Sequence, residues 1–154
     1  TTYNTNLKMN PPLRSKADNA ALIEGIKDGT IDCIVTDHAP HADHEKAREF
    51  ELAPFGMTGL ETSLGVILTY LVDPGLITYN ELVELMAIKP REILRLDQVT
   101  LKQGSVAEVT WTVQSDDMYS KSHNSGFLGY TLKGRATDVF VGGTVTCKDG
   151  VVVE

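Results

Sequence analysis

The strongest constraint on the fold is a short apolar segment that ends in a cluster of polar residues. Residues 31–36 read Ile-Asp-Cys-Ile-Val-Thr, which is rich in β-branched residues and does not alternate cleanly between apolar and polar. This pattern is typical of a strand buried on both faces, as in a parallel sheet. A helix and a tight turn precede it and a polar loop follows, which predicts a β/α barrel or a doubly wound sheet. We therefore expect an α/β fold.

The helices are predicted from their capping residues and apolar patterns. Ser15 and Asp18 form a pair that resembles a capping box, and Gly29 offers a left-handed cap, so a helix is expected between them. Further helices are expected over residues 60–72, over residues 79–88 behind a capping box of Thr78 and Glu81, and from Pro90 to about residue 96.

After residue 97 the pattern changes to short β-rich segments. Strands are expected over residues 107–113, 135–141, 144–147 and 151–153, with turns at Gly142-Gly143 and Asp149-Gly150. We therefore predict two parts. Residues 1–97 form the carboxy-terminal part of a β/α barrel, and residues 98–154 form a small subdomain like a β-sandwich.

Composition and charge exclude several classes of function. The 154 residues carry 14 basic and 21 acidic side chains, a formal charge of -7, so no basic surface for nucleic acid is expected. The longest apolar stretch, residues 64–72, is far shorter than the roughly 20 residues of a membrane span. Cys33 and Cys147 lie in apolar segments, which indicates buried free thiols in a reducing compartment and hence a cytoplasmic protein.

The densest group of reactive side chains follows residues 31–36 directly. It begins at Asp37, and three of the four histidines, His38, His41 and His44, lie within seven residues of one another. In a β/α barrel the carboxyl ends of the strands line the active site. There a carboxylate binds a cation or acts as a general base. By itself, an aspartate at the end of a strand is more often a helix cap or part of a turn, and His38 is expected either to pack or to support a neighbouring site residue.

Two further segments are candidates for ligand binding. Asn10 precedes two prolines that favour an extended backbone, and its side chain offers both a donor and an acceptor. Phe55 and Gly56 lie in a glycine-containing loop, where the backbone approaches a ligand closely and the ring covers it. An ordinary proline-rich connection and a hinge before the next helix remain the alternatives.

Taken together, these segments resemble the dihydroorotases of the amidohydrolase superfamily, in particular the bacterial two-domain type. Related allantoinases and hydantoinases share the aspartate, whereas the combination of Asn-Pro-Pro-Leu-Arg with Asp-His-Ala-Pro-His favours dihydroorotase. The resemblance implies an amidohydrolase-type barrel for residues 1–97. The matching stretches are residues 10–14, 28–32, 36–41, 54–56, 59–61, 120–122, 127–129 and 133–135.

The resemblance also implies roles for single residues. Asp37 matches a catalytic aspartate that is also a zinc ligand, Asn10 and His41 match substrate-binding residues, and Phe55 with Gly56 matches a backbone pair that contacts the substrate. The implied reaction is the reversible, zinc-dependent closure of N-carbamoyl-L-aspartate to L-dihydroorotate in pyrimidine synthesis. One or two zinc ions are implied as cofactor.

The family's other metal ligands are not found in the sequence. It has neither the His-x-His pair of the first barrel strand nor the arginine that follows that pair, and a catalytic zinc needs about three protein ligands. We therefore expect a fragment that is inactive alone. The alternatives are a non-catalytic subunit that acts as a scaffold for a transcarbamoylase, and a sister cyclic amidohydrolase. A homo-oligomer and a complex with aspartate transcarbamoylase both remain open.

Overall fold

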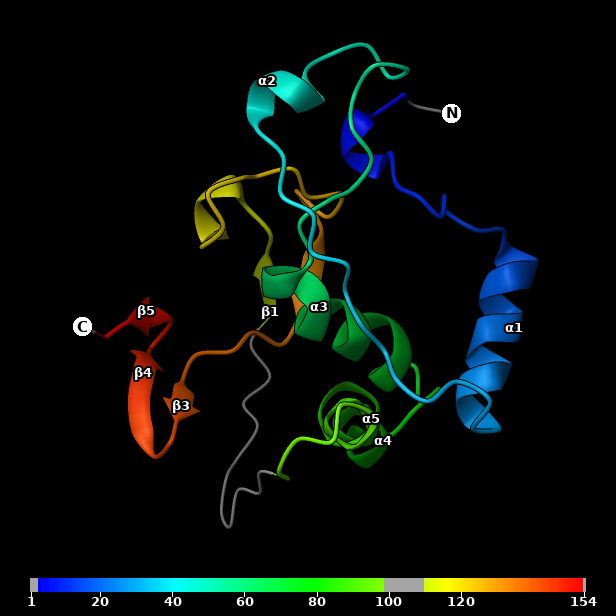
Figure 1. Ribbon diagram of the computed structural model, residues 1–154, viewed down its shortest axis with the longest axis vertical. Helices are drawn as coiled ribbons and strands as arrows, with labels where there is room; N and C mark the ends of the chain where they lie inside the picture. The colour runs from blue at the N-terminus through cyan, green and yellow to red at the C-terminus, as the bar shows by residue number, and fades with distance from the viewer. Residues whose placement is uncertain (1–2, 99–109, 154) are drawn as a thin grey trace.

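The computed structural model describes residues 3–98 and 110–153, and a small sheet lies near the carboxy terminus (Figure 1). The first segment contains one short 3-10 helix, η1 (Thr5–Leu7). Among the described residues, no helix has both the length and the apolar character to span a membrane.

Helix α1 (Lys16–Lys27) begins and ends as predicted. The Ser15 hydroxyl accepts a hydrogen bond from the Asp18 N–H, and the Asp18 carboxylate accepts one from the Ser15 N–H. These two bonds satisfy amide groups that a helix start leaves without partners. The Ser15 hydroxyl also donates to the Asp18 carboxylate, and this bond, together with the one from the Ser15 N–H, holds the pKa of the Asp18 carboxyl below its usual range because both favour the charged form. Gly29 ends this segment with φ +79°, so the left-handed cap is confirmed.

The central helices form the larger hydrophobic core. Its buried members are Leu68, Ile77, Leu82 and Leu85, and Ile34 packs against them at the edge. The predicted helices are confirmed, although two of them continue as single π-helical turns. The elements are α3 (Leu60–Ile67), η2 (Leu68–Val72), α4 (Tyr79–Val83), η3 (Glu84–Ile88) and α5 (Lys89–Ile93).

Residues 31–36 do not form the buried strand that their composition predicts. The segment is extended, but its Val35 side chain is 76% exposed. The Ile34 N–H donates to the Leu85 carbonyl, and one parallel bridge joins His38 to Met57. A strand needs neighbours on both sides to complete its hydrogen bonds, and the described residues provide only this single bridge. The prediction of a strand buried on both faces is therefore wrong for this chain.

The first β unit packs against α3. Strand β1 (Thr110–Thr112) pairs with β2 (Thr131–Lys133) in antiparallel register, and η4 (Ser115–Asp117) lies between them. Val113, Met118 and Leu132 form a second buried cluster, and Val66 of α3 packs against it. Strand β2 was not predicted, and residues 107–109 of the first expected strand lie outside the described residues.

The second β unit is a three-stranded sheet with two tight turns. It consists of β3 (Val139–Val141), β4 (Thr144–Lys148) and β5 (Val151–Val152), in that order and antiparallel. Both predicted turns are confirmed, since Gly142 and Gly143 have φ of 57° and 84°, and Asp149 and Gly150 have 50° and 77°. Two consecutive positive φ values match the right-handed twist of hairpin strands. The division at residue 97 stays a prediction.

The two cysteines differ in part from the expectation. Cys33 and Cys147 are free thiols, as predicted, but each is partly exposed rather than buried.

Candidate functional site

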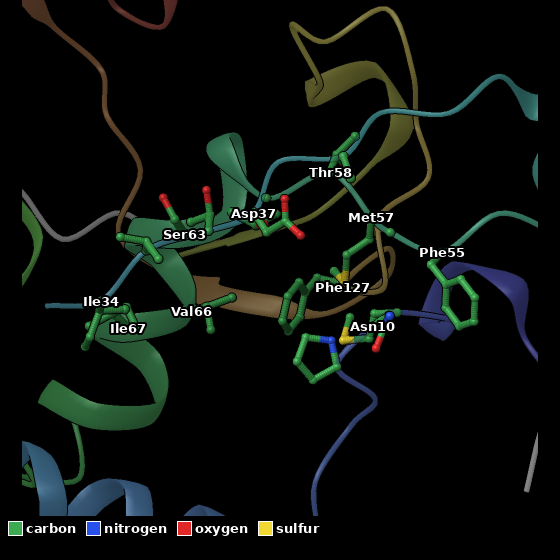
Figure 2. A pocket seen from close by; sticks show the side chains of 18 of the residues that line it. Asn10, Ile34, Asp37, Phe55, Met57, Thr58, Ser63, Val66, Ile67 and Phe127 are labelled. Carbon is green, nitrogen blue, oxygen red and sulfur yellow. The ribbon is translucent and has the colours of Figure 1, made fainter. Parts of the chain in front are cut away.

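One cavity of about 370 Å³ brings together segments that are far apart in the sequence. Asn10, Asp37, Phe55 and Gly56 all line it, and Figure 2 shows the side chains of the first three along its wall. The cavity lies beside the start of α3, with Phe127 from the carboxy-terminal part also in its lining. Four of the five predicted site residues therefore share one cavity, and the fifth, His41, lies directly beside it.

Asp37 lies at the end of the extended segment, and its carboxylate is exposed. Among the described residues it accepts no hydrogen bond and forms no ion pair. An aspartate that capped a helix or closed a turn would bind nearby amide groups, and this one does not. The geometry therefore favours a role toward a ligand over the local structural role that the sequence left open.

His38 holds the beginning of α3. Its Nδ1 accepts hydrogen bonds from the N–H groups of Gly59 at 3.1 Å and Leu60 at 3.2 Å. Nδ1 is therefore the unprotonated nitrogen of this ring, and it caps a helix whose own cap residue, Gly59, has no side chain. His38 therefore has a structural role through hydrogen bonds, within the expectation that it packs or supports a neighbouring residue. By this contact the residue after Asp37 anchors its loop to α3.

His41 contacts the backbone of the phenylalanine–glycine pair. Its Nε2 lies 2.8 Å from the Phe55 carbonyl oxygen, which only accepts, so Nε2 carries the hydrogen. On the other side of the ring, Nδ1 lies 3.9 Å from a carboxylate oxygen of Glu45 in the short helix α2 (Asp43–Lys46). The predicted substrate residue His41 thus orients Phe55, which lines the cavity.

Gly56 is a position where only glycine fits. Its φ is +120°, and a Cβ there would lie 2.5 Å from the Cβ of Ala39 and 3.3 Å from His41 Nε2. The Gly56 N–H donates to the Lys8 carbonyl, and the Gly56 carbonyl accepts from Lys46 and Asn124. The close approach of the two loops that line the cavity therefore depends on the missing side chain.

Asn124 joins these loops, and its role was not predicted. The side chain is 3% exposed; its oxygen accepts from the His41 N–H at 3.0 Å, and its nitrogen donates to the carbonyls of Ala39 at 3.0 Å and Gly56 at 3.3 Å. It lies between the matching stretches 120–122 and 127–129, and this position was the only sequence signal for it.

We expect Asn124→Ala to destabilise the protein and to loosen both loops. The change removes three hydrogen bonds and leaves the Ala39 carbonyl and the His41 N–H without a partner, while the Gly56 carbonyl keeps Lys46, and this costs about 2–4 kcal/mol of unfolding free energy. Urea unfolding measures the change. The control is Asn19→Ala on the exposed face of α1, which should change the free energy by less than about 0.5 kcal/mol. Equal effects of the two variants would contradict the bridging role.

The chain's own residues do not amount to a complete metal site. Within residues 3–98 and 110–153, no three histidine, cysteine, aspartate or glutamate side chains are grouped closely enough to hold an ion. A catalytic zinc uses about three protein ligands. Asp37 offers one carboxylate without a partner, so by itself it fits the place of one ligand and no more.

Comparison with known proteins identifies the family. A dihydroorotase from Geobacter metallireducens is 52% identical over 153 residues, which cover 95% of this chain. Another, from Endomicrobium trichonymphae, is 46% identical over 151 residues. The chain belongs to the dihydroorotase family. It spans about 36% of the length of each of these dihydroorotases, and no family model matches it.

A solved structure confirms the fold class. An L-hydantoinase (dihydropyrimidinase) from Arthrobacter aurescens superimposes with a TM-score of 0.84 and 30% identity, over 99% of this chain and 36% of that one. The predicted α/β class, as the carboxy-terminal part of an amidohydrolase-type barrel, is therefore confirmed. The higher identity to the dihydroorotases favours that family over the hydantoinases.

Proposed function

We propose that this chain supplies the carboxy-terminal part of a dihydroorotase active site. The reaction would be the reversible closure of N-carbamoyl-L-aspartate to L-dihydroorotate. The observation that carries the proposal is the shared cavity of Asn10, Asp37, Phe55 and Gly56 in a chain of this family. The rest of the site would come from the remainder of a longer protein.

Asp37 is the proposed catalytic residue. In the hydrolytic direction, water adds to the ring carbonyl, and the carboxylate takes the proton that the water loses. The C–N bond then breaks, and the same proton passes to the departing nitrogen. A free and exposed carboxylate at the cavity suits both steps, because no other group of the described residues competes for its oxygens.

The other residues of the site are proposed to bind the substrate. Asn10 offers a donor and an acceptor at the cavity wall. In the Phe55–Gly56 pair, three of four backbone polar groups already have partners, and the Phe55 N–H has none among the described residues. We therefore assign that N–H to the substrate. His41 would hold the Phe55 carbonyl and contact the substrate from beside it.

Zinc is the metal that the proposal implies, as one or two ions with most ligands outside this chain. Asp37 is the one ligand assigned here. A cytoplasmic location, a homo-oligomer and a complex with aspartate transcarbamoylase remain predictions that belong to the longer protein.

The assay uses the complete protein that contains this chain. We expect it to convert L-dihydroorotate to N-carbamoyl-L-aspartate and back, with one or two zinc ions per chain, and to leave allantoin and hydantoins unchanged. Turnover of those compounds without turnover of dihydroorotate would assign the protein to a sister cyclic amidohydrolase. Absence of both metal and turnover would favour a non-catalytic subunit.

A further inference from the structure

Two buried lysines lie behind the loop that carries the phenylalanine–glycine pair. Lys8 is 9% exposed and Lys46 is 5% exposed. Lysine is almost never this buried without a carboxylate partner, and neither forms an ion pair with any described residue. The pKa of the Lys46 ammonium is lowered mainly by burial, and the nearby charge of Lys8 lowers it further. The two ammonium groups thus repel each other, and something must compensate for their burial.

Backbone carbonyls of the loop provide that compensation. The Lys8 ammonium donates to the carbonyls of Glu51 at 2.9 Å and Ala53 at 2.7 Å. The Lys46 ammonium donates to the carbonyls of Pro54 at 3.0 Å and Gly56 at 2.9 Å. Four carbonyls within six residues therefore point toward two cations, so the loop is folded around positive charge.

The aromatic residue of the cavity also contacts this charge. Lys8 Nζ lies 4.6 Å from the centre of the Phe55 ring, which is within the range of a cation–π interaction. The Lys8 carbonyl in turn accepts from the Gly56 N–H. Lys8 thus contacts both the ring of Phe55 and the backbone N–H of Gly56.

We propose that Lys8 and Lys46 are positioning residues that hold residues 51–56 in the conformation that presents Phe55 and Gly56 to the cavity. The proposal rests on the proposed function for its substrate, dihydroorotate. A core that needed only packing would be filled by methionine or leucine, without the cost of burying a charge. Each ammonium group has three N–H donors and no acceptor, so it binds two carbonyls of the loop at once, which methionine or leucine could not do.

The test is Lys46→Met in the complete protein. Methionine keeps much of the side-chain volume and removes every donor. Within residues 51–56, we expect the hydrogen-bonded amides of Leu52, Ala53 and Gly56 to exchange with deuterium at least about tenfold faster, while those of α3 and α4 are unchanged. We expect KM for dihydroorotate to rise about tenfold or more and kcat to fall less than about threefold. The control is Lys27→Met, because Lys27 is exposed and, among the described residues, forms an ion pair with Glu24 alone.

A merely structural role gives a different result. A smaller folded fraction would lower the apparent kcat, leave KM unchanged and speed exchange throughout the molecule, and that outcome would overturn the proposal. Unchanged exchange in residues 51–56 would overturn it as well. If the complete protein does not turn over dihydroorotate, the proposed function fails, and the exchange of residues 51–56 still tests the lysines independently.

The unaltered protein provides a second measurement if Lys46→Met does not fold. Ammonium groups bonded to buried carbonyls exchange their hydrogens slowly, so nitrogen NMR should detect signals from two lysines. Lys8→Met should remove one of them and speed the exchange of residues 51–53. Detection of the two signals with this response would support the proposal. Their absence would overturn it, because the carbonyl contacts would then not persist in solution.

Discussion

Asp37→Ala is expected to remove nearly all turnover of dihydroorotate by the complete protein. The change deletes the proposed general base and the one metal ligand of this chain together, so kcat should fall by at least about a thousandfold. Stability should change by less than about 0.5 kcal/mol, since the carboxylate is exposed and has no hydrogen-bond partner among the described residues. Steady-state kinetics and urea unfolding measure the two effects.

Asp32→Ala is the matched control for this prediction. Asp32 lies five residues earlier on the same extended segment, is exposed, and is absent from the cavity lining. Its variant should retain the rate of the unaltered protein. A near-normal rate for Asp37→Ala would show that the catalytic role is assigned to the wrong residue, whereas loss of activity in both variants would indicate a general effect on the segment.

Gly56→Ala is expected to have the second largest effect, on both stability and substrate affinity. The added Cβ meets the Cβ of Ala39 at 2.5 Å in a backbone conformation with φ +120°. Strain and overlap together should cost about 2–5 kcal/mol of unfolding free energy. If the loop moves to relieve this overlap, the hydrogen bonds of Gly56 with Lys8 and Lys46 break. The KM for dihydroorotate should therefore also rise.

Two further variants separate the overlap from the strain. Gly75→Ala has a similar problem of positive φ, +71°, but its Cβ meets nothing within 4 Å, so its cost should be about 1–2 kcal/mol. The double variant that combines Gly56→Ala with Ala39→Gly lacks the overlapping Cβ of Ala39. It should therefore regain the part of the unfolding free energy that Gly56→Ala loses through overlap. If Gly56→Ala cost no more than Gly75→Ala, the close approach of the two loops would be refuted.

Local features were predicted well because they depend on a few neighbouring residues. The capping boxes at Ser15 and Thr78 and the turns at Gly142 and Asp149 satisfy backbone groups within four residues of themselves, and all four are confirmed. The segment 31–36 was predicted wrongly because a strand is defined by its partners. Composition alone does not reveal whether those partners are present.

The site was predicted in part for the same reason. Asp37 and Asn10 were singled out by their motifs, and their meeting at one cavity agrees with the resemblance. Asn124 was missed because it contacts Ala39, 85 positions away, and isolated polar residues in loops carry no signal of such contacts. Lys8 and Lys46 were missed because lysine is usually a solvated residue.

The amino-acid sequence alone determined the helix ends, the two hairpin turns, the family and the candidate residues, because each depends on short-range geometry or on ordered motifs. Only the tertiary structure determined that Phe55 and Gly56 are held together by His41, Asn124 and two buried ammonium groups. The physical reason is that burial and charge compensation are properties of the packed loops together. No single segment of the chain contains them.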